Sequence, residues 1–180
     1  MKIFPYIKTV SPFNSDKMNN DTEKPKLYLE TTVPSYLTAR QSRDVIQLAR
    51  QQITAEWWNS RLNDFDVFIS QIVNDEAGSG DPDAARKRMM AIQSFPLLEI
   101  TEEVTELAEK ILRKGVIPEK GARDATHIAV AVCHGMNFLL TWNCRHIANA
   151  EKIKALENIC RSGSYELPVI CTPEEFSERS

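Results

Sequence analysis

The sequence predicts an α/β domain in which helices cover both faces of a central, mostly parallel sheet. Five short apolar segments recur along the chain, and segments with helical spacing separate them in the order β-α-α-β-α-α-β-α-α-β-α-β. Strands that alternate with helices pair in parallel and are buried on both faces. The chain has 180 residues, of which 42% are hydrophobic and 26% charged. This size and composition are typical of one globular domain.

The domain is expected to begin after a polar N-terminal segment. Residues 1–25 have no sustained period and predict a flexible extension; residues 26–176 form the domain and residues 177–180 a tail. Within residues 26–32 (KLYLETT), an apolar run predicts a buried strand with Glu30 at its carboxyl end. The alternative for Glu30 is a solvated acid at a strand end.

The middle of the domain holds a second acid. Residues 43–59 have helical spacing, with Trp57 as a core residue or, alternatively, part of a dimer surface. A strand at residues 66–70 leads into a helix in which Glu76 shares a face with Ile72, whereas Asp75 is turned about 100° away. Glu76 is therefore expected to point toward the interior.

A basic cluster follows the second acid. Asp81 and Pro82 predict the start of a helix over residues 82–94. This helix carries Arg86, Lys87 and Arg88, which form either a solvated face or a contact to a phosphate backbone.

The last third holds a buried helix with an acid at its first turn. A strand at residues 97–100 precedes a capped, amphipathic helix that ends at Gly115. Residues 125–133 are uncharged, which predicts a buried helix, and Asp124 at its start is either an N-cap or a functional acid. Residues 137–142 predict a strand followed by Asn143, and a helix near residues 151–156 and a strand at residues 167–170 complete the domain.

Charge, cysteines and hydropathy exclude several classes of protein. A net charge of −3 argues against a protein that coats nucleic acid by bulk electrostatics. The four cysteines form no CxxC pair, which favours free thiols in a reducing cytoplasm. No apolar run is long enough for a membrane span, and the N-terminus lacks the apolar centre of a signal peptide.

Glu30, Glu76, Asp124 and Asn143 come from four segments and are expected to meet at one rim of the sheet. Three carboxylates in one pocket repel one another unless a cation joins them. Oxygen ligands favour Mg²⁺ or Mn²⁺, and such centres activate water and clamp phosphate oxygens. The composition of this pocket therefore suggests phosphodiester hydrolysis.

Several motifs carry a resemblance to a known family. The segments YLETTVPSYL, SQIVNDE, RDATHIAVAVCHG and NFLLTWNCRHIAN resemble the PIN-domain family, and in particular the VapC-type toxin ribonucleases of bacterial toxin–antitoxin pairs. The match covers residues 26–176. It implies a PIN-like (Rossmann-like) α/β/α sandwich and a Mg²⁺- or Mn²⁺-dependent endoribonuclease that acts on RNA. It also implies a homodimer and a small antitoxin partner.

The resemblance assigns roles by position. The first acid of the family falls on Glu30, where the usual residue is Asp; the second and third fall on Glu76 and Asp124; the fourth falls on Asn143, which carries no charge. Thr31 matches the hydroxyl residue that often follows the first acid. Because Glu30 is longer by about 1.5 Å and Asn143 is neutral, we expect one well-occupied cation site, with Asn143 as an accessory ligand.

Two alternatives remain open. His127, one turn after Asp124, is either a donor or general acid beside the site or a satisfied buried histidine; its spacing does not fit a zinc site. The whole chain is either a ribonuclease or a catalytically weak PIN-like module that binds RNA or a protein. An aspartyl phosphatase is excluded, because Glu30 is followed by two threonines rather than by the required Asp-x-Asp.

Overall fold

Five parallel strands form the central sheet of the computed structural model, which describes residues 23–176. The strands lie in the order β3-β2-β1-β4-β5, and all four pairings are parallel. Their bounds are β1 Lys26–Leu29, β2 Asp66–Ser70, β3 Leu97–Leu98, β4 Phe138–Leu140 and β5 Val169–Cys171. The predicted α/β class with a parallel sheet is therefore confirmed.

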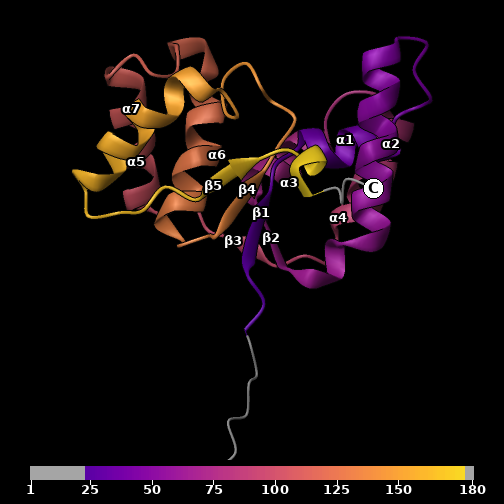
Figure 1. The fold of residues 1–180 in the computed structure, drawn as a ribbon, viewed down its shortest axis with the longest axis horizontal. Helices are drawn as coiled ribbons and strands as arrows, with labels where there is room; N and C mark the ends of the chain where they lie inside the picture. The colour runs from indigo at the N-terminus through magenta and orange to yellow at the C-terminus, as the bar shows by residue number, and fades with distance from the viewer. Residues whose placement is uncertain (1–22, 177–180) are drawn as a thin grey trace, which may run out of the picture.

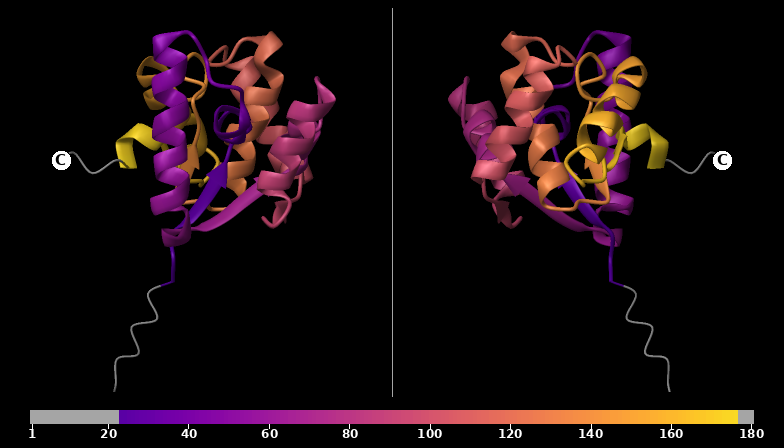
Figure 2. Two further views of the ribbon diagram at one scale, coloured as in Figure 1. Left: turned by 90° about the vertical axis from the view of Figure 1, so that its right-hand side faces the viewer. Right: turned by 90° about the vertical axis from the view of Figure 1, so that its left-hand side faces the viewer.

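The helices form two groups, which Figure 1 shows on opposite sides of the sheet. One group contains α5, α6 and α7, and in the other α1 packs on α2 and α4. The bounds of the helices are α1 Thr32–Thr38, α2 Val45–Ser60, α3 Gln71–Ala77, α4 Pro82–Ile92, α5 Glu102–Arg113, α6 Ala122–Cys133 and α7 Ala150–Arg161. Two side views of the same layers are given in Figure 2. The predicted order of strands and helices matches this arrangement.

The core is built around β1 and α6. Leu27, Tyr28 and Leu29 of β1 are fully buried, because β2 and β4 pair with this strand on either side. Most of α6 is buried as well, as its lack of charged side chains from residue 125 onward predicts. Trp57 is a core residue that packs near Phe65. A dimer surface built on the Trp57 ring is therefore not needed to explain its apolar character.

Local chemistry explains where several elements begin and end. Asp81 caps α4 by accepting from Ala84 N–H, and Pro82 is the first residue of the helix. Gly115 adopts φ +68° just past α5, a conformation that glycine adopts without steric cost. The edge strands differ from their predicted bounds: β3 stops at Leu98, and β5 begins two residues later and ends one residue later than expected. An edge strand has one neighbour only, so its apolar run marks its ends poorly.

Two further predictions concern the chain as a whole. All four cysteines lie within residues 23–176 and are free, as expected. No helix in this part of the chain is long and apolar enough to cross a membrane. The predicted N-terminal extension and C-terminal tail fall almost wholly outside the described residues.

Candidate metal centre

The candidate site lies at the carboxyl edge of the sheet, where β1, β2 and β4 end. The register pairs Leu29 with Leu140, so the next residues, Glu30 and Thr141, also lie side by side. On the other side of β1, strand β2 runs directly into α3, which carries Glu76. The three strand ends therefore bring together residues that lie up to 111 positions apart in the sequence.

Glu30 is buried, with 3% of its surface exposed, and one of its oxygens is held by three donors. Its Oε2 accepts from Thr32 N–H at 3.1 Å, from the Thr32 hydroxyl, and from Thr141 Oγ1 at 2.6 Å. No residue in the range 23–176 donates to Oε1 of Glu30. The carboxylate is therefore fixed through one oxygen and keeps the other available.

Glu76 is held in a similar way. Its Oε2 accepts from Thr31 Oγ1 at 2.5 Å and lies 3.2 Å from Nε2 of His127, while Oε1 lies 3.5 Å from Nη1 of the exposed Arg123. Burial would raise the pKa of Glu76, but the hydrogen bonds from His127 and Thr31 together with the charge of Arg123 lower the pKa below its ordinary value. Glu76 is therefore a carboxylate at neutral pH.

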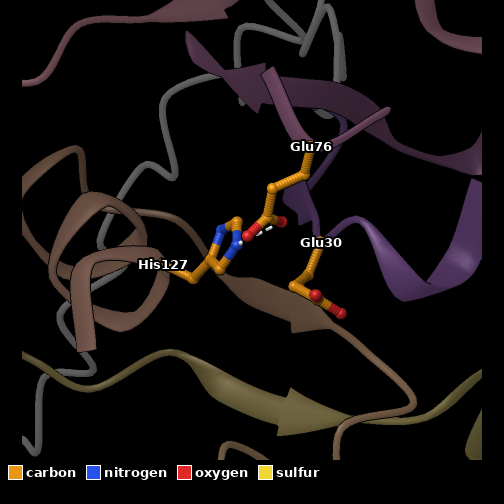
Figure 3. A group of neighbouring side chains, drawn as sticks. All are labelled: Glu30, Glu76 and His127. Carbon is orange, nitrogen blue, oxygen red and sulfur yellow. Dashed lines mark hydrogen bonds and ion pairs between the residues drawn. The ribbon is translucent and has the colours of Figure 1, made fainter. Parts of the chain in front are cut away.

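Glu30, Glu76 and His127 lie close together. One ligand atom from each of the three residues lies within 4.8 Å of the others. Figure 3 shows Glu76 and His127 pointing toward one another, with Glu30 beside them at the end of β1. His127 is 1% exposed, and its Nδ1 lies 2.8 Å from the hydroxyl of Tyr28. His127 is therefore a buried histidine with hydrogen-bond partners on both ring nitrogens. It also lies beside the candidate site.

Asp124 and Asn143 form a second cluster with His146. Asn143 Nδ2 donates to Asp124 Oδ1 at 2.9 Å, and His146 Nδ1 lies 2.7 Å from Asp124 Oδ2. Asn143 Oδ1 accepts from the backbone N–H of His146 at 3.1 Å. The amide of Asn143 is thus used at both ends, as a donor to a carboxylate and an acceptor from the backbone. In this orientation Asn143 braces Asp124 and does not present its carbonyl oxygen to Glu30 or Glu76.

A short hydrogen-bond path joins the two clusters. The backbone N–H of Asn143 donates to Thr141 Oγ1 at 2.9 Å, and Thr141 in turn donates to Glu30. Asp124 itself is not part of the three-residue group around Glu30. The structure therefore places all four predicted residues at one edge of the sheet, in two linked clusters rather than in one cup.

The donor set fits a hard divalent cation. Carboxylate oxygens are the ligands that Mg²⁺ and Mn²⁺ prefer. Glu30 offers its free Oε1, and each oxygen of Asp124 accepts one hydrogen bond although a carboxylate oxygen has room for two. Hydrogen bonds from Thr31, Thr32 and Thr141 orient the carboxylates in the manner of the outer partners of metal ligands.

The basic cluster on α4 divides into two parts. Arg88 donates to the backbone carbonyls of Ala77 and Ser79 at 2.9 and 2.6 Å and so closes the C-terminus of α3. Arg86 and Lys87 are exposed. Arg86 also lies 3.4 Å from Asp83, in an exposed ion pair, so Arg86 and Lys87 are the two that solvent and a phosphate backbone can reach.

Sequence reasoning missed four hydroxyl groups of the site. Thr32 and Thr141 hold Glu30, and Ser70 and Tyr28 stand behind His127. The threonines had a signal, because Thr32 lies two residues after Glu30 and Thr141 directly follows an apolar strand. Tyr28 had none, because within an apolar run it is indistinguishable from a core residue.

Comparisons with known proteins give a match in structure but not in sequence. Neither protein-family models nor curated proteins match the chain. Among solved structures it is similar to VapC20 of Mycobacterium tuberculosis, a toxin that cleaves the sarcin–ricin loop. The identity is 19% and the TM-score 0.53, over 69% of this chain and 95% of that one.

Two toxin–antitoxin structures are also similar. For VapBC-1 of nontypeable Haemophilus influenzae the TM-score is 0.52 at 16% identity, over 83% of this chain and 98% of that one. For a toxin–antitoxin complex of Klebsiella pneumoniae it is 0.51 at 16% identity, over 82% and 97%. At these identities the likeness concerns the fold. The chain thus has the VapC-like PIN fold that its sequence motifs predict.

Proposed function

We propose that this chain is a divalent-metal-dependent endoribonuclease and the toxin of a toxin–antitoxin pair. The observation that carries the proposal is the meeting of Glu30 and Glu76 at the carboxyl edge of a VapC-like sheet, with Asp124 in the adjoining cluster. Carboxylates placed this close favour a bound cation, since it offsets their repulsion.

Each residue of the site has a definite task in this proposal. Glu30, Glu76 and Asp124 would hold Mg²⁺ or Mn²⁺, which when bound supplies a Lewis acid for phosphodiester hydrolysis. Thr32 and Thr141 orient Glu30, and Thr31 orients Glu76. Asn143 holds the carboxylate of Asp124 by donating to its Oδ1.

Arg123 is placed to receive the substrate. Its side chain is 70% exposed, and its guanidinium lies 3.5 Å from Oε1 of Glu76. An RNA phosphate that approaches the carboxylates passes this positive charge. Arg86 and Lys87 on α4 would contact the RNA backbone further from the reacting phosphate.

A groove lined partly by α2 and α7 supports a protein partner. It has a volume of about 640 Å³ and lies between α2 and the start of α7. Val45 and Ile46, both exposed, line it together with Ile53 and Ile153. Such a groove suits the apolar face of an amphipathic segment, and in this proposal the segment belongs to an antitoxin. A homodimer is also proposed, by likeness to the family.

Cleavage of a structured, end-labelled RNA tests the proposal. The wild-type chain is expected to cut in Mn²⁺ and to stop cutting in EDTA. Asp124→Asn and Glu30→Gln are expected to abolish cleavage. Glu109→Gln is a matched control, because Glu109 is an exposed acid on α5 that pairs with Arg113.

The same assay distinguishes the ribonuclease from the alternative, a PIN-like module that has little or no catalytic activity. A PIN-like module without activity would bind RNA or a protein without cutting, with or without Mn²⁺. Cleavage that survives EDTA and both site substitutions would reject the metal-dependent reaction.

A further inference from the structure

A buried chain of hydrogen bonds runs from β2 to the candidate metal centre. Ser70 Oγ lies 2.7 Å from the hydroxyl of Tyr28, and that hydroxyl lies 2.8 Å from His127 Nδ1. His127 Nε2 then lies 3.2 Å from Oε2 of Glu76. Ser70 and Tyr28 are fully buried and His127 is 1% exposed, so water does not complete these bonds.

Ser70, at the start of this series of hydrogen bonds, does not make the contact expected of its position. Ser70 is the N-cap residue of α3, a position where a serine side chain normally accepts from the helix backbone. Here its side chain makes no capping bond. The hydroxyl is directed to Tyr28 instead, which indicates that the helix cap has been exchanged for the interior contact.

The available donors and acceptors determine which group donates in each of these hydrogen bonds. A carboxylate oxygen only accepts, so the 3.2 Å contact between Glu76 Oε2 and His127 Nε2 is a hydrogen bond when the hydrogen is on Nε2. Neutral imidazole then has a bare Nδ1, which accepts from the Tyr28 hydroxyl. The oxygen of Tyr28 in turn accepts from Ser70, and every buried group is satisfied.

The opposite direction leaves a group unsatisfied. A hydrogen on Nδ1 of His127 would turn the Tyr28 hydroxyl toward Ser70. The hydroxyl hydrogen of Ser70 would then need another acceptor, and none is found for it among residues 23–176. A buried donor without an acceptor is unfavourable, so Ser70 disfavours this arrangement.

We propose that Tyr28 and Ser70 are positioning residues that hold His127 with its hydrogen on Nε2, so that His127 orients Glu76 and does not itself bind the cation. This inference rests on the proposed metal-dependent function. It assigns the nitrogen of the three-residue group to a hydrogen bond, so the cation is held by oxygen atoms alone, as Mg²⁺ prefers.

NMR of the full-length protein labelled with ¹⁵N-histidine tests which nitrogen of His127 carries the hydrogen. The protein has three histidines, and the signals lost in His127→Gln identify His127. Long-range ¹H–¹⁵N couplings are expected to show a hydrogen on Nε2 and a bare Nδ1, unchanged when Mg²⁺ is added. A hydrogen on Nδ1, or a change of tautomer with Mg²⁺, would overturn the inference.

Mn²⁺ titration of variants tests the positioning role. Tyr28→Phe is expected to weaken Mn²⁺ binding about 10- to 100-fold, the range that follows loss of the outer partners of metal ligands, and Ser70→Ala to weaken it less. Tyr36→Phe is the matched control, because Arg50, at 3.4 Å, is the one hydrogen-bond partner of the Tyr36 hydroxyl within residues 23–176. Equal affinities for wild type and a folded Tyr28→Phe would reject the positioning role.

The two experiments also separate this inference from the proposed function. If the wild-type chain binds no Mn²⁺, the proposed function fails, and the NMR measurement on the metal-free protein alone decides the direction of the chain. The NMR measurement uses the wild-type protein, so it stands even if Tyr28→Phe does not fold.

Discussion

Replacing Thr141 by valine should remove the hydrogen bond that Thr141 donates to Glu30 while keeping the packing of the core. Thr141 is fully buried at the end of β4, and valine has nearly the same shape. The hydroxyl makes two short bonds and one longer contact. It donates to Glu30 Oε2 at 2.6 Å, accepts from Asn143 N–H at 2.9 Å, and lies 3.4 Å from Thr32 Oγ1. The substitution removes these interactions and leaves the shape of the side chain nearly unchanged.

The magnitude follows from the kind of bond lost. A hydrogen bond to a charged group contributes about 1.5–3 kcal/mol, and a neutral one about 1 kcal/mol. Asn143 is half-buried, so water can replace part of its lost bond. We expect Thr141→Val to lower the free energy of unfolding by about 2–4 kcal/mol, measured by urea denaturation, and to weaken Mn²⁺ binding about 10-fold.

Thr54→Val is the matched control. Thr54 is also fully buried and also makes two bonds, a donated one to Arg50 O at 2.6 Å and an accepted one from Trp142 Nε1 at 2.8 Å. Its loss should lower stability while leaving Mn²⁺ affinity unchanged. If Thr141→Val and Thr54→Val affect Mn²⁺ binding equally, or if Thr141→Val loses less than about 1 kcal/mol, the assigned support of Glu30 is refuted.

Three further predictions concern space, titration and thiol reactivity. A Cβ at Gly121 would lie 2.8 Å from a side-chain carbon and 3.2 Å from Asp124 Oδ2, so Gly121→Ala should lower stability by about 1–3 kcal/mol; an unchanged Tm would contradict the crowding. Because the pKa of Glu76 is lowered in the folded state, Glu76 stabilises the fold above its ordinary pKa, and this contribution disappears as pH falls through the lowered pKa. The difference in unfolding free energy between wild type and Glu76→Gln should therefore shrink from pH 7 to pH 3, and a difference that grows would refute the sign. The exposed Cys144 should react with a thiol reagent at pH 8 in the native protein, whereas Cys171, buried and with its pKa raised to about 12 by burial, should react only after denaturation; native labelling of Cys171 would contradict this.

The residues at strand ends were predictable because a parallel sheet imposes their meeting place. Glu30 directly follows an apolar run, and the strand ends of a parallel sheet share one edge, so its position follows from the pattern alone. Glu76 was predictable from helical spacing, since it shares a face with the apolar residues of α3. These inferences need only the period of each element and the order of the strands.

The division of the site into two clusters was not predictable in this way. It depends on the amide of Asn143, which binds Asp124 and the backbone of His146 at the same time. That arrangement follows from the path of a loop, which has no period in the sequence. His146 lies in this loop and contacts both Asn143 and Asp124.

The hydrogen bonds of the Tyr28 hydroxyl were also not predictable from the sequence. The apolar run that contains Tyr28 between Leu27 and Leu29 predicts a core position, and the ring of Tyr28 is in the core. Its hydroxyl, however, reaches Ser70 and His127 on other elements. Such a contact joins residues 42 and 99 positions apart, so only the packed structure reveals it.

Isothermal titration of the full chain with Mn²⁺ tests the central claim most directly, because that claim is the gathering of carboxylates around a divalent cation. Wild type and Glu109→Gln should each bind about one Mn²⁺ per chain with equal affinity, in keeping with the single site expected from a pocket of oxygen ligands. Glu30→Gln should bind none in the same range. Absence of binding to wild type, or equal binding by Glu30→Gln, would contradict the account.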